Sequence, residues 1–178
     1  MYGIKRNPYE YRLHRFEHVP GHELGRVARV LEVMNTAPRG ELDPEDWTVT
    51  PEVVASHQAA AEATGAKRLL YTAEHLASAK FVAFSEVKWH PLRAGLIDQQ
   101  GTAVHSGHRG RGLARWLKAA VLLDLPAANP LGRKLYTSNA DGNAAMLGIN
   151  RALGFVPAFC RTVWQGETQA LLTASTRD

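Results

Sequence analysis

The segment Ser106–Ala114 constrains the fold more than any other part of this chain. It contains three glycines and two arginines, and it joins a β-rich segment that ends at Val104 to an amphipathic helix expected from Leu113 onward. Glycines allow successive backbone N–H groups to point into one concavity, and the N-terminus of a helix adds a partial positive charge there. The segment therefore predicts a binding site for an anionic group, and its two arginines make a pyrophosphate suitable.

The rest of the sequence predicts a single mixed α/β domain over residues 1–178. Apolar residues at helical spacing predict helices, and runs of aromatic and β-branched residues predict strands. Thr50, Pro51 and Gly65 are typical of the N-cap, first turn and end of a helix. This element order implies a mixed sheet with helices on both faces. The expected elements are a strand over 9–20, helices over 21–34 and 51–64, strands over 68–74, 80–89 and 96–104, a helix from 113, a strand over 134–138, a helix over 143–153, and a hairpin of strands over 155–164 and 169–175.

Composition and charge narrow the class of protein. No apolar run is long enough to span a membrane, and the first residues lack the apolar core of a signal peptide. The single cysteine, Cys160, cannot form an internal disulfide, so a cytoplasmic protein is expected. No histidines have the spacing of a metal site. The net charge of +4 is a weak sign of nucleic-acid binding. The basic residues are scattered, except for a cluster that a phosphate site explains: His108, Arg109, Arg111, Arg115 and Lys118.

Three known phosphate-binding patterns can be compared with the glycine-rich segment. A P-loop requires Gly-Lys-Ser or Gly-Lys-Thr, which the sequence lacks, and a dinucleotide fingerprint requires a glycine where Arg115 stands. The third pattern, [Q/R]-x-x-G-x-[G/A], is met in full by Arg109-Gly110-Arg111-Gly112-Leu113-Ala114. With this pattern the chain resembles the GNAT superfamily of N-acetyltransferases, in which it is the acetyl-CoA signature. Downstream, Thr137–Phe155 is similar to the fifth strand and fourth helix of that family, with Asn-x-x-x-Asn and Leu-Gly-Phe elements.

The resemblance implies the GNAT acyl-CoA N-acyltransferase fold, which has a central mixed β-sheet and about four helices. The phrases Thr102-Ala103-Val104, His108-Arg109-Gly110 and Asn139-Ala140 look most like the C-terminal half of bacterial tandem-GNAT proteins. On this resemblance the chain is either a free-standing version of such a half or a fragment of a longer protein. A homodimer or a second GNAT domain is the expected protein partner.

The resemblance also implies a site for acetyl-CoA as co-substrate. In the family the fourth and fifth strands separate, and the pantetheine arm of CoA fills the gap. The amide of Val104 would then polarise the thioester carbonyl, and Asn139 and Asn143 would reach the pantetheine amides. Asn139 has an equally good interpretation as a helix N-cap, whereas ligand contact is favoured for Asn143. The pyrophosphate would lie on the backbone of Arg109, Gly110, Arg111, Gly112, Leu113 and Ala114.

Acetyl transfer also needs a base for the incoming ammonium and an acid for the departing thiolate. Many GNAT enzymes use a tyrosine as the acid, four residues before the glycine of Leu-Gly-Phe, and here that position is Asn150. An asparagine cannot donate a proton near neutral pH, although it can orient a water or hydrogen-bond the sulfur. Asn143 and Asn150 are expected to share the cleft-facing side of their helix. The candidate bases are Glu86, Asp98 and His105, each of which has an alternative as a surface or capping residue.

The favoured function is transfer of an acetyl group from acetyl-CoA to a primary amine, by direct attack and without a covalent enzyme intermediate. A small-molecule acceptor is expected, with no nucleic acid, membrane or metal. The acidic segment Glu41–Asp46 could attract a cationic acceptor, or it could be a solvated turn. A second hypothesis, favoured by Asn150, is a non-catalytic acyl-CoA-binding domain. A nucleic-acid-binding module that uses the Arg-Gly-Arg turn is a distant third.

Overall fold

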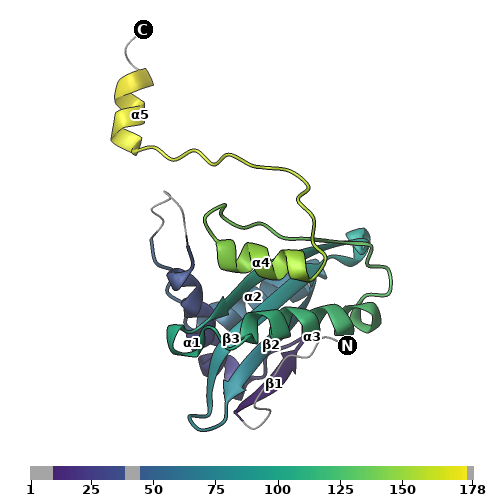
Figure 1. The fold of residues 1–178 in the computed structure, drawn as a ribbon. Helices are drawn as coiled ribbons and strands as arrows, with labels where there is room; N and C mark the ends of the chain where they lie inside the picture. The colour runs from purple at the N-terminus through teal and green to yellow at the C-terminus, as the bar shows by residue number, and fades with distance from the viewer. Residues whose placement is uncertain (1–9, 39–44, 176–178) are drawn as a thin grey trace.

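The fold is built on one five-stranded sheet. The structure, a computed structural model, describes residues 10–38 and 45–175 (Figure 1). The strands lie side by side in sequence order; β1 to β4 are antiparallel and β5 runs parallel to β4. This mixed sheet confirms the expected fold class. The strands are β1 (Tyr11–Phe16), β2 (Lys67–His75), β3 (Lys80–Trp89), β4 (Leu96–Val104) and β5 (Lys134–Tyr136).

Helices cover both faces of the sheet, with α2 behind it and α3 in front in Figure 1. α2 begins as the sequence predicts, because the Thr50 side chain accepts a hydrogen bond from the Val53 amide at 3.3 Å, and it ends at Gly65 with φ 77°. None of the helices within residues 10–38 and 45–175 has both the length and the hydropathy of a membrane span. The α-helices are α1 (Leu24–Leu31), α2 (Pro51–Thr64), α3 (Leu113–Ala128), α4 (Ala144–Ala152) and α5 (Thr168–Ser175).

The core consists of two apolar layers, one on each side of the sheet. Beneath α1 and α2, Val27 packs in a cluster with Leu70 and Phe84. Beneath α3, Leu117 packs with other apolar side chains of the opposite face, and Val121 continues that layer. Because both faces are covered, β3 is buried along nearly its whole length, as expected of a strand inside a layered α/β fold. The core thereby fixes the position of β4, which neighbours β3.

The expected C-terminal hairpin is wrong. Residues 155–167 have no regular secondary structure, and the last described residues form α5, which lies apart from the rest of the fold in Figure 1. Ala170, Leu171 and Leu172 favour a helix, and Pro157 cannot donate a hydrogen bond to a ladder. No strand within residues 10–38 and 45–154 pairs with this segment, so local helix propensity decides the conformation of Thr168–Ser175.

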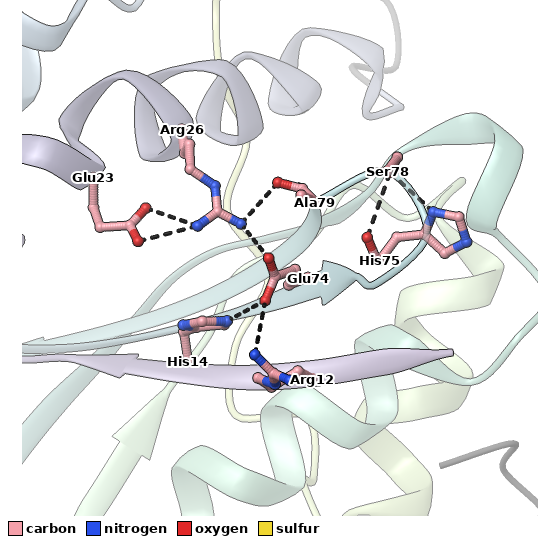
Figure 2. Close-up of polar contacts among 8 residues, drawn as sticks. All are labelled: Arg12, His14, Glu23, Arg26, Glu74, His75, Ser78 and Ala79. Atoms are coloured by element: carbon pink, nitrogen blue, oxygen red, sulfur yellow. Dashed lines mark hydrogen bonds and ion pairs between the residues drawn. The ribbon is translucent and has the colours of Figure 1, made fainter. Parts of the chain in front are cut away.

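A buried carboxylate links β1, β2 and α1. Glu74 shares a hydrogen bond with His14 Nε2 at 2.7 Å and accepts another from Arg26 Nη2 at 2.7 Å. Arg26 also donates to Glu23 and to the Ala79 carbonyl (Figure 2). Burial tends to raise the pKa of Glu74, but the hydrogen bonds from His14 and Arg26 outweigh it and hold that pKa below its ordinary value. The carboxylate is therefore ionised at neutral pH and ties the three elements together.

We expect Glu74→Ala to lower the free energy of unfolding by about 3 kcal/mol at pH 7, because it leaves the Arg26 guanidinium without one of its anions. Because the pKa of Glu74 is lowered, this contribution is present above the ordinary glutamate pKa of about 4.3 and is lost as the pH falls below it. Urea denaturation at pH 7 and pH 3.5 measures both effects. Glu17→Ala is the control, since its ion pair with Arg15 is exposed and should contribute less than about 1 kcal/mol. Equal losses in the two variants would contradict the prediction.

Candidate functional site

A cleft opens where β5 leaves β4. The two strands pair from Leu96 with Lys134 to Asp98 with Tyr136, and in the described part of the chain the ladder goes no further. A cavity of about 560 Å³ occupies the gap. It is lined from both faces of the sheet, because its walls include Met34 on the side of α1 as well as a residue of α3. The cavity is also lined by Asp98–Thr102, Tyr136–Ala140, Asn143, Met146, Phe159, Arg161 and Lys118.

β4 is bulged beside this cavity. Ser85 pairs with Thr102 and Val87 pairs with Gln99, so one residue of β3 lies opposite residues 100–101 of β4. Such a bulge bends the strand and changes the direction of its backbone groups, and bulges of this kind are frequent next to active sites. The path of β4 therefore diverges from that of β5 at the point where the cavity begins.

Two residues of β4, Gln99 and Gly101, accommodate the bulge. Gln99 is buried, and its Nε2 donates at 2.7 Å to the carbonyl of Glu86, the β3 residue opposite the bulge. Gly101 fits because a Cβ at this position would lie 3.0 Å from the Phe84 ring and 3.2 Å from Met34 Sδ. The absence of a side chain at Gly101 thus allows β4 to approach the core closely.

The last residues of β4 expose their backbone on the side of the cleft. The His105 amide donates to the Val82 carbonyl at 2.8 Å, so these two residues form a hydrogen-bonded pair. Pairs alternate along an antiparallel ladder, and Val104 and Thr102 therefore occupy non-hydrogen-bonded positions, with their N–H and C=O groups pointing away from β3. The Val104 carbonyl accepts a hydrogen bond from Arg109 Nε at 3.0 Å. An extended ligand in the cleft could pair with the remaining groups, and Thr102 was not among the residues expected from sequence.

The turn after β4 places glycines in the left-handed region. Gly110 and Gly112 both have φ 75°, a conformation that glycine adopts readily and other residues rarely do. Gly112 is the N-cap of α3. The first amides of α3 have no acceptor within the helix, so the N-terminus of this 16-residue helix directs N–H groups and a partial positive charge into the turn. This geometry suits an anionic group.

The two arginines of the turn are held by the rest of the fold. Arg109 Nη2 donates to Thr36 Oγ1 at 2.6 Å, and Arg111 forms an ion pair with Glu10 at 3.2 Å. Both guanidinium groups therefore keep their charge close to the glycine turn. Arg109 also connects the turn to the segment after α1, which borders the cleft.

Three histidine rings lie close together beside the glycine turn. His108 Nδ1 is 2.9 Å from Tyr11 Oη, and its ring centroid is 4.8 Å from that of His75 and 6.0 Å from that of His105. Burial, followed by the nearby charges of His75 and Arg111, lowers the pKa of His108. Within residues 10–38 and 45–175, no cluster of histidine, cysteine or acidic side chains could hold a metal ion. His108 is therefore mainly neutral at physiological pH and packs beneath the turn.

The three candidate bases have different environments. Asp98 lines the cavity. Glu86 is buried and pairs with Arg68 at 3.0 Å and with Lys88 at 3.6 Å. His105 is exposed and caps the short 3-10 turn that follows it, with its Nδ1 3.4 Å from the Gly107 amide nitrogen. Of these three candidates only Asp98 lines the cavity, and its position therefore favours it as the base.

The three asparagines between Thr137 and Phe155 have different hydrogen-bond partners. Asn143 is the N-cap of α4, and its Oδ1 accepts from the Met146 amide at 3.2 Å; the capping interpretation considered for Asn139 was wrong and belongs to Asn143. Asn139 accepts a hydrogen bond from Asn150 Nδ2 at 2.7 Å. Asn150 is 6% exposed, and among the described residues its Oδ1 has no hydrogen-bond partner. Asn139 and Asn143 line the cavity. Asn150 is not a lining residue, and it orients Asn139 through their hydrogen bond.

Lys118 is another lining residue that the sequence did not indicate as part of the site. It was grouped with the basic residues of the glycine turn, but its side chain is 1% exposed and lines the cavity. Burial lowers the pKa of Lys118 to about 8. The available signal was its position on α3, one residue after Leu117 and three before Val121, both of which are buried. A charged residue beside such a stripe indicates a polar gap in the core.

Comparison with known proteins identifies the fold. No family model and no curated protein matches the sequence. Among solved structures, the chain is similar to the tandem GNAT protein from the clavulanic acid biosynthesis pathway, with 26% identity, a TM-score of 0.67, and coverage of 87% of this chain and 45% of that one. This chain has the GNAT acetyltransferase fold. It spans about half the length of the tandem protein that it matches.

Two further GNAT-fold neighbours were solved with CoA groups. AAC(6')-Iy in complex with the bisubstrate analogue CoA-S-monomethyl-acetylneamine is 14% identical, with a TM-score of 0.58 and coverage of 88% of this chain and 98% of that one. YncA from Salmonella typhimurium, solved with acetyl-CoA, is 16% identical, with a TM-score of 0.58 and coverage of 81% and 79%. At these identities the likeness concerns the fold.

Proposed function

We propose that this GNAT domain transfers an acetyl group from acetyl-CoA to the primary amine of a small molecule. The observation that carries the proposal is the order of three features along the chain: the cleft between β4 and β5, the outward-facing backbone of Thr102 and Val104, and the left-handed glycine turn at the start of α3. An acyl-CoA has matching parts in the same order, namely a thioester, an extended arm with amide groups, and a pyrophosphate.

Each part of acetyl-CoA has a chemically suitable partner in this chain. The pyrophosphate would accept hydrogen bonds from the backbone of Arg109–Ala114, beside the two arginine charges. The pantetheine arm would pair with Thr102 and Val104, and Asn139 and Asn143 would contact it from the opposite wall of the cleft. The Val104 amide, the candidate from sequence for polarising the thioester carbonyl, lies on the pyrophosphate side of Thr102 and is better placed to hold the arm. The CoA groups bound to two GNAT-fold neighbours support this assignment.

The reaction needs few groups from the protein. Acetyl-CoA supplies an activated carbonyl carbon, which the amine nitrogen attacks as the carbon–sulfur bond breaks. We propose Asp98 as the group that takes the proton of the amine, since it lines the cavity; Glu86 and His105 are the alternatives, one in an ion pair and the other exposed. Asn150 would act by orienting Asn139. The acidic segment Glu41–Asp46 lies largely outside the described residues, so its part in binding the acceptor stays a prediction.

The test is thiol release from acetyl-CoA in the presence of a panel of amines that includes polyamines, amino sugars and amino acids. We expect turnover with at least one small cationic amine, partly because one GNAT-fold neighbour was solved with an acetylneamine analogue. Calorimetric titration with acetyl-CoA is measured in parallel. Binding without turnover across the panel would favour the non-catalytic acyl-CoA-binding domain, which the asparagine at position 150 would explain. Absence of acetyl-CoA binding would overturn the proposal.

A further inference from the structure

Lys118 lies where an ordinary structural lysine would be unfavourable. Its side chain is almost fully buried on the sheet-facing side of α3, between Leu117 and Val121. The Nζ atom lies 5.1 Å from the centroid of the Phe155 ring. No ion pair within residues 10–38 and 45–175 includes Lys118. Burying an ammonium group without an anion is costly, so a functional explanation is warranted.

The position of Lys118 along α3 places it beside the outer end of the cleft. It follows Ala114, the last residue of the glycine turn, by four residues, which is about 6 Å along a helix. The connection from β4 through α3 to the parallel strand β5 requires α3 to return alongside β4. Thr102 precedes Val104 by two residues, which is about 6.6 Å along a strand. Lys118 and Thr102 line the same cavity.

We propose that Lys118 is the acid that protonates the sulfur of CoA as it leaves. The inference rests on the proposed function, which places the thioester in this cleft. A nitrogen–carbon bond forms as the amine attacks, the carbon–sulfur bond breaks, and its electron pair passes to the sulfur. A proton moves from Lys118 Nζ to that sulfur and gives the thiol. The proton that the amine loses passes to solvent. Neutral Lys118 takes a proton back from solvent, so the reaction as a whole neither gains nor loses a proton.

The other ionisable groups around the cavity are less suited to this step. They are Asp98 on β4, Tyr136 on β5 and Arg161 on the C-terminal segment. A guanidinium does not release its proton near neutral pH, and an ionised carboxylate has none to give. Tyr136 pairs with Asp98, the proposed base, where β4 and β5 still pair, which in this assignment is the side of the amine and not of the departing sulfur. The pKa of Lys118, about 8, is close to the value of about 8.5 for a thiol, so transfer between them is nearly balanced.

The test compares binding of CoA and of desulfo-CoA, which lacks the sulfur, by calorimetry at pH 7. We expect the wild type to bind CoA at least about tenfold more tightly, because a charged donor contacts the sulfur. Lys118→Met should abolish this preference, while Tyr136→Phe should keep it. A merely structural lysine would change both affinities together. The comparison needs no knowledge of the acceptor.

The outcomes separate the inference from the proposed function. A wild type without the preference, or a Lys118→Met variant that keeps it, overturns the assignment of Lys118; if that variant does not fold, Lys118→Gln is measured in the same way. A wild type that binds neither compound overturns the proposed function itself. With an acceptor from the amine panel, Lys118→Met should lower kcat about 100-fold or more and change the KM for acetyl-CoA little. Lys118→Arg should not restore kcat, because its guanidinium keeps its proton.

Discussion

Gly112→Asp should weaken acetyl-CoA binding about 100-fold or more. The new carboxylate would stand at the N-cap of α3, next to the proposed pyrophosphate site. Two negative charges about 5 Å apart repel each other by about 3 kcal/mol at an effective dielectric constant of 20, and about 2.7 kcal/mol is a factor of 100 in affinity. The measurement is calorimetric titration with acetyl-CoA, after circular dichroism has shown that the variant is folded.

Gly65→Asp is the matched control for this prediction. Gly65 has φ 77°, close to the 75° of Gly112, so both substitutions carry the same backbone cost of about 1–2 kcal/mol. A Cβ at Gly65 would meet only the end of the His90 ring, at 4.0 Å, at the C-terminus of α2. We expect this variant to bind acetyl-CoA as the wild type does. Equal affinity losses in the two variants, or unchanged binding by Gly112→Asp, would exclude the glycine turn as the pyrophosphate site.

Lys118→Met should stabilise the fold at pH 7 by about 3 kcal/mol. The pKa of Lys118 falls from 10.5 to about 8 on folding, and each pKa unit corresponds to 1.36 kcal/mol, which gives the expected value of about 3 kcal/mol. Because the folded state binds this proton more weakly, the charged lysine destabilises the protein fully below pH 8. The destabilisation fades as the pH rises from about 8 to 10.5, where the lysine is neutral in both states. Urea denaturation from pH 7 to pH 10 measures the effect.

The difference in stability between wild type and Lys118→Met should therefore shrink over that pH range. Lys67→Met is the control, since Lys67 is exposed at the start of β2. A surface change of this kind alters stability by less than about 0.5 kcal/mol. A Lys118→Met variant that is less stable than the wild type at pH 7 would show that the ammonium has a favourable partner. A variant that loses sulfur recognition while it gains stability would demonstrate a trade-off between function and stability.

Much of the fold could be predicted from sequence because its signals are local. Thr50, Pro51 and Gly65 define α2 through contacts within the same helix, and β2 to β4 contain β-branched and aromatic residues between clear breaks. The two strands expected at the C-terminus were wrong, because a strand has no comparable local signal. A strand is stable only beside another strand, and the sequence of residues 155–175 contains no information on whether a neighbour is present. Without a neighbouring strand, the helix propensity of residues such as Leu171 and Leu172 determines the observed helix.

The same distinction applies to the site. The glycine turn is contiguous in sequence, and its φ angles and its position at a helix N-terminus follow from residues within it. The helical spacing placed Lys118 beside the apolar stripe of α3, but its burial in the wall of a cavity depends on elements that are distant in sequence. The pairings of Asn150 with Asn139 and of Glu86 with Arg68 likewise depend on the fold. Residue types at the site were readable from sequence, whereas their partners were not.

The side chain of Gln99 gives the cleft a property that matters for affinity. Its hydrogen bond to the Glu86 carbonyl joins β4 to β3 at the bulge, so a contact within the protein holds the bent path of β4. A strand that is already bent loses little conformational entropy when an extended chain pairs with it, and preorganisation of this kind strengthens binding without adding contacts. The bent path of β4 would therefore be preformed for the arm of the proposed ligand. Discrimination among acyl groups must then arise from the side chains at its end.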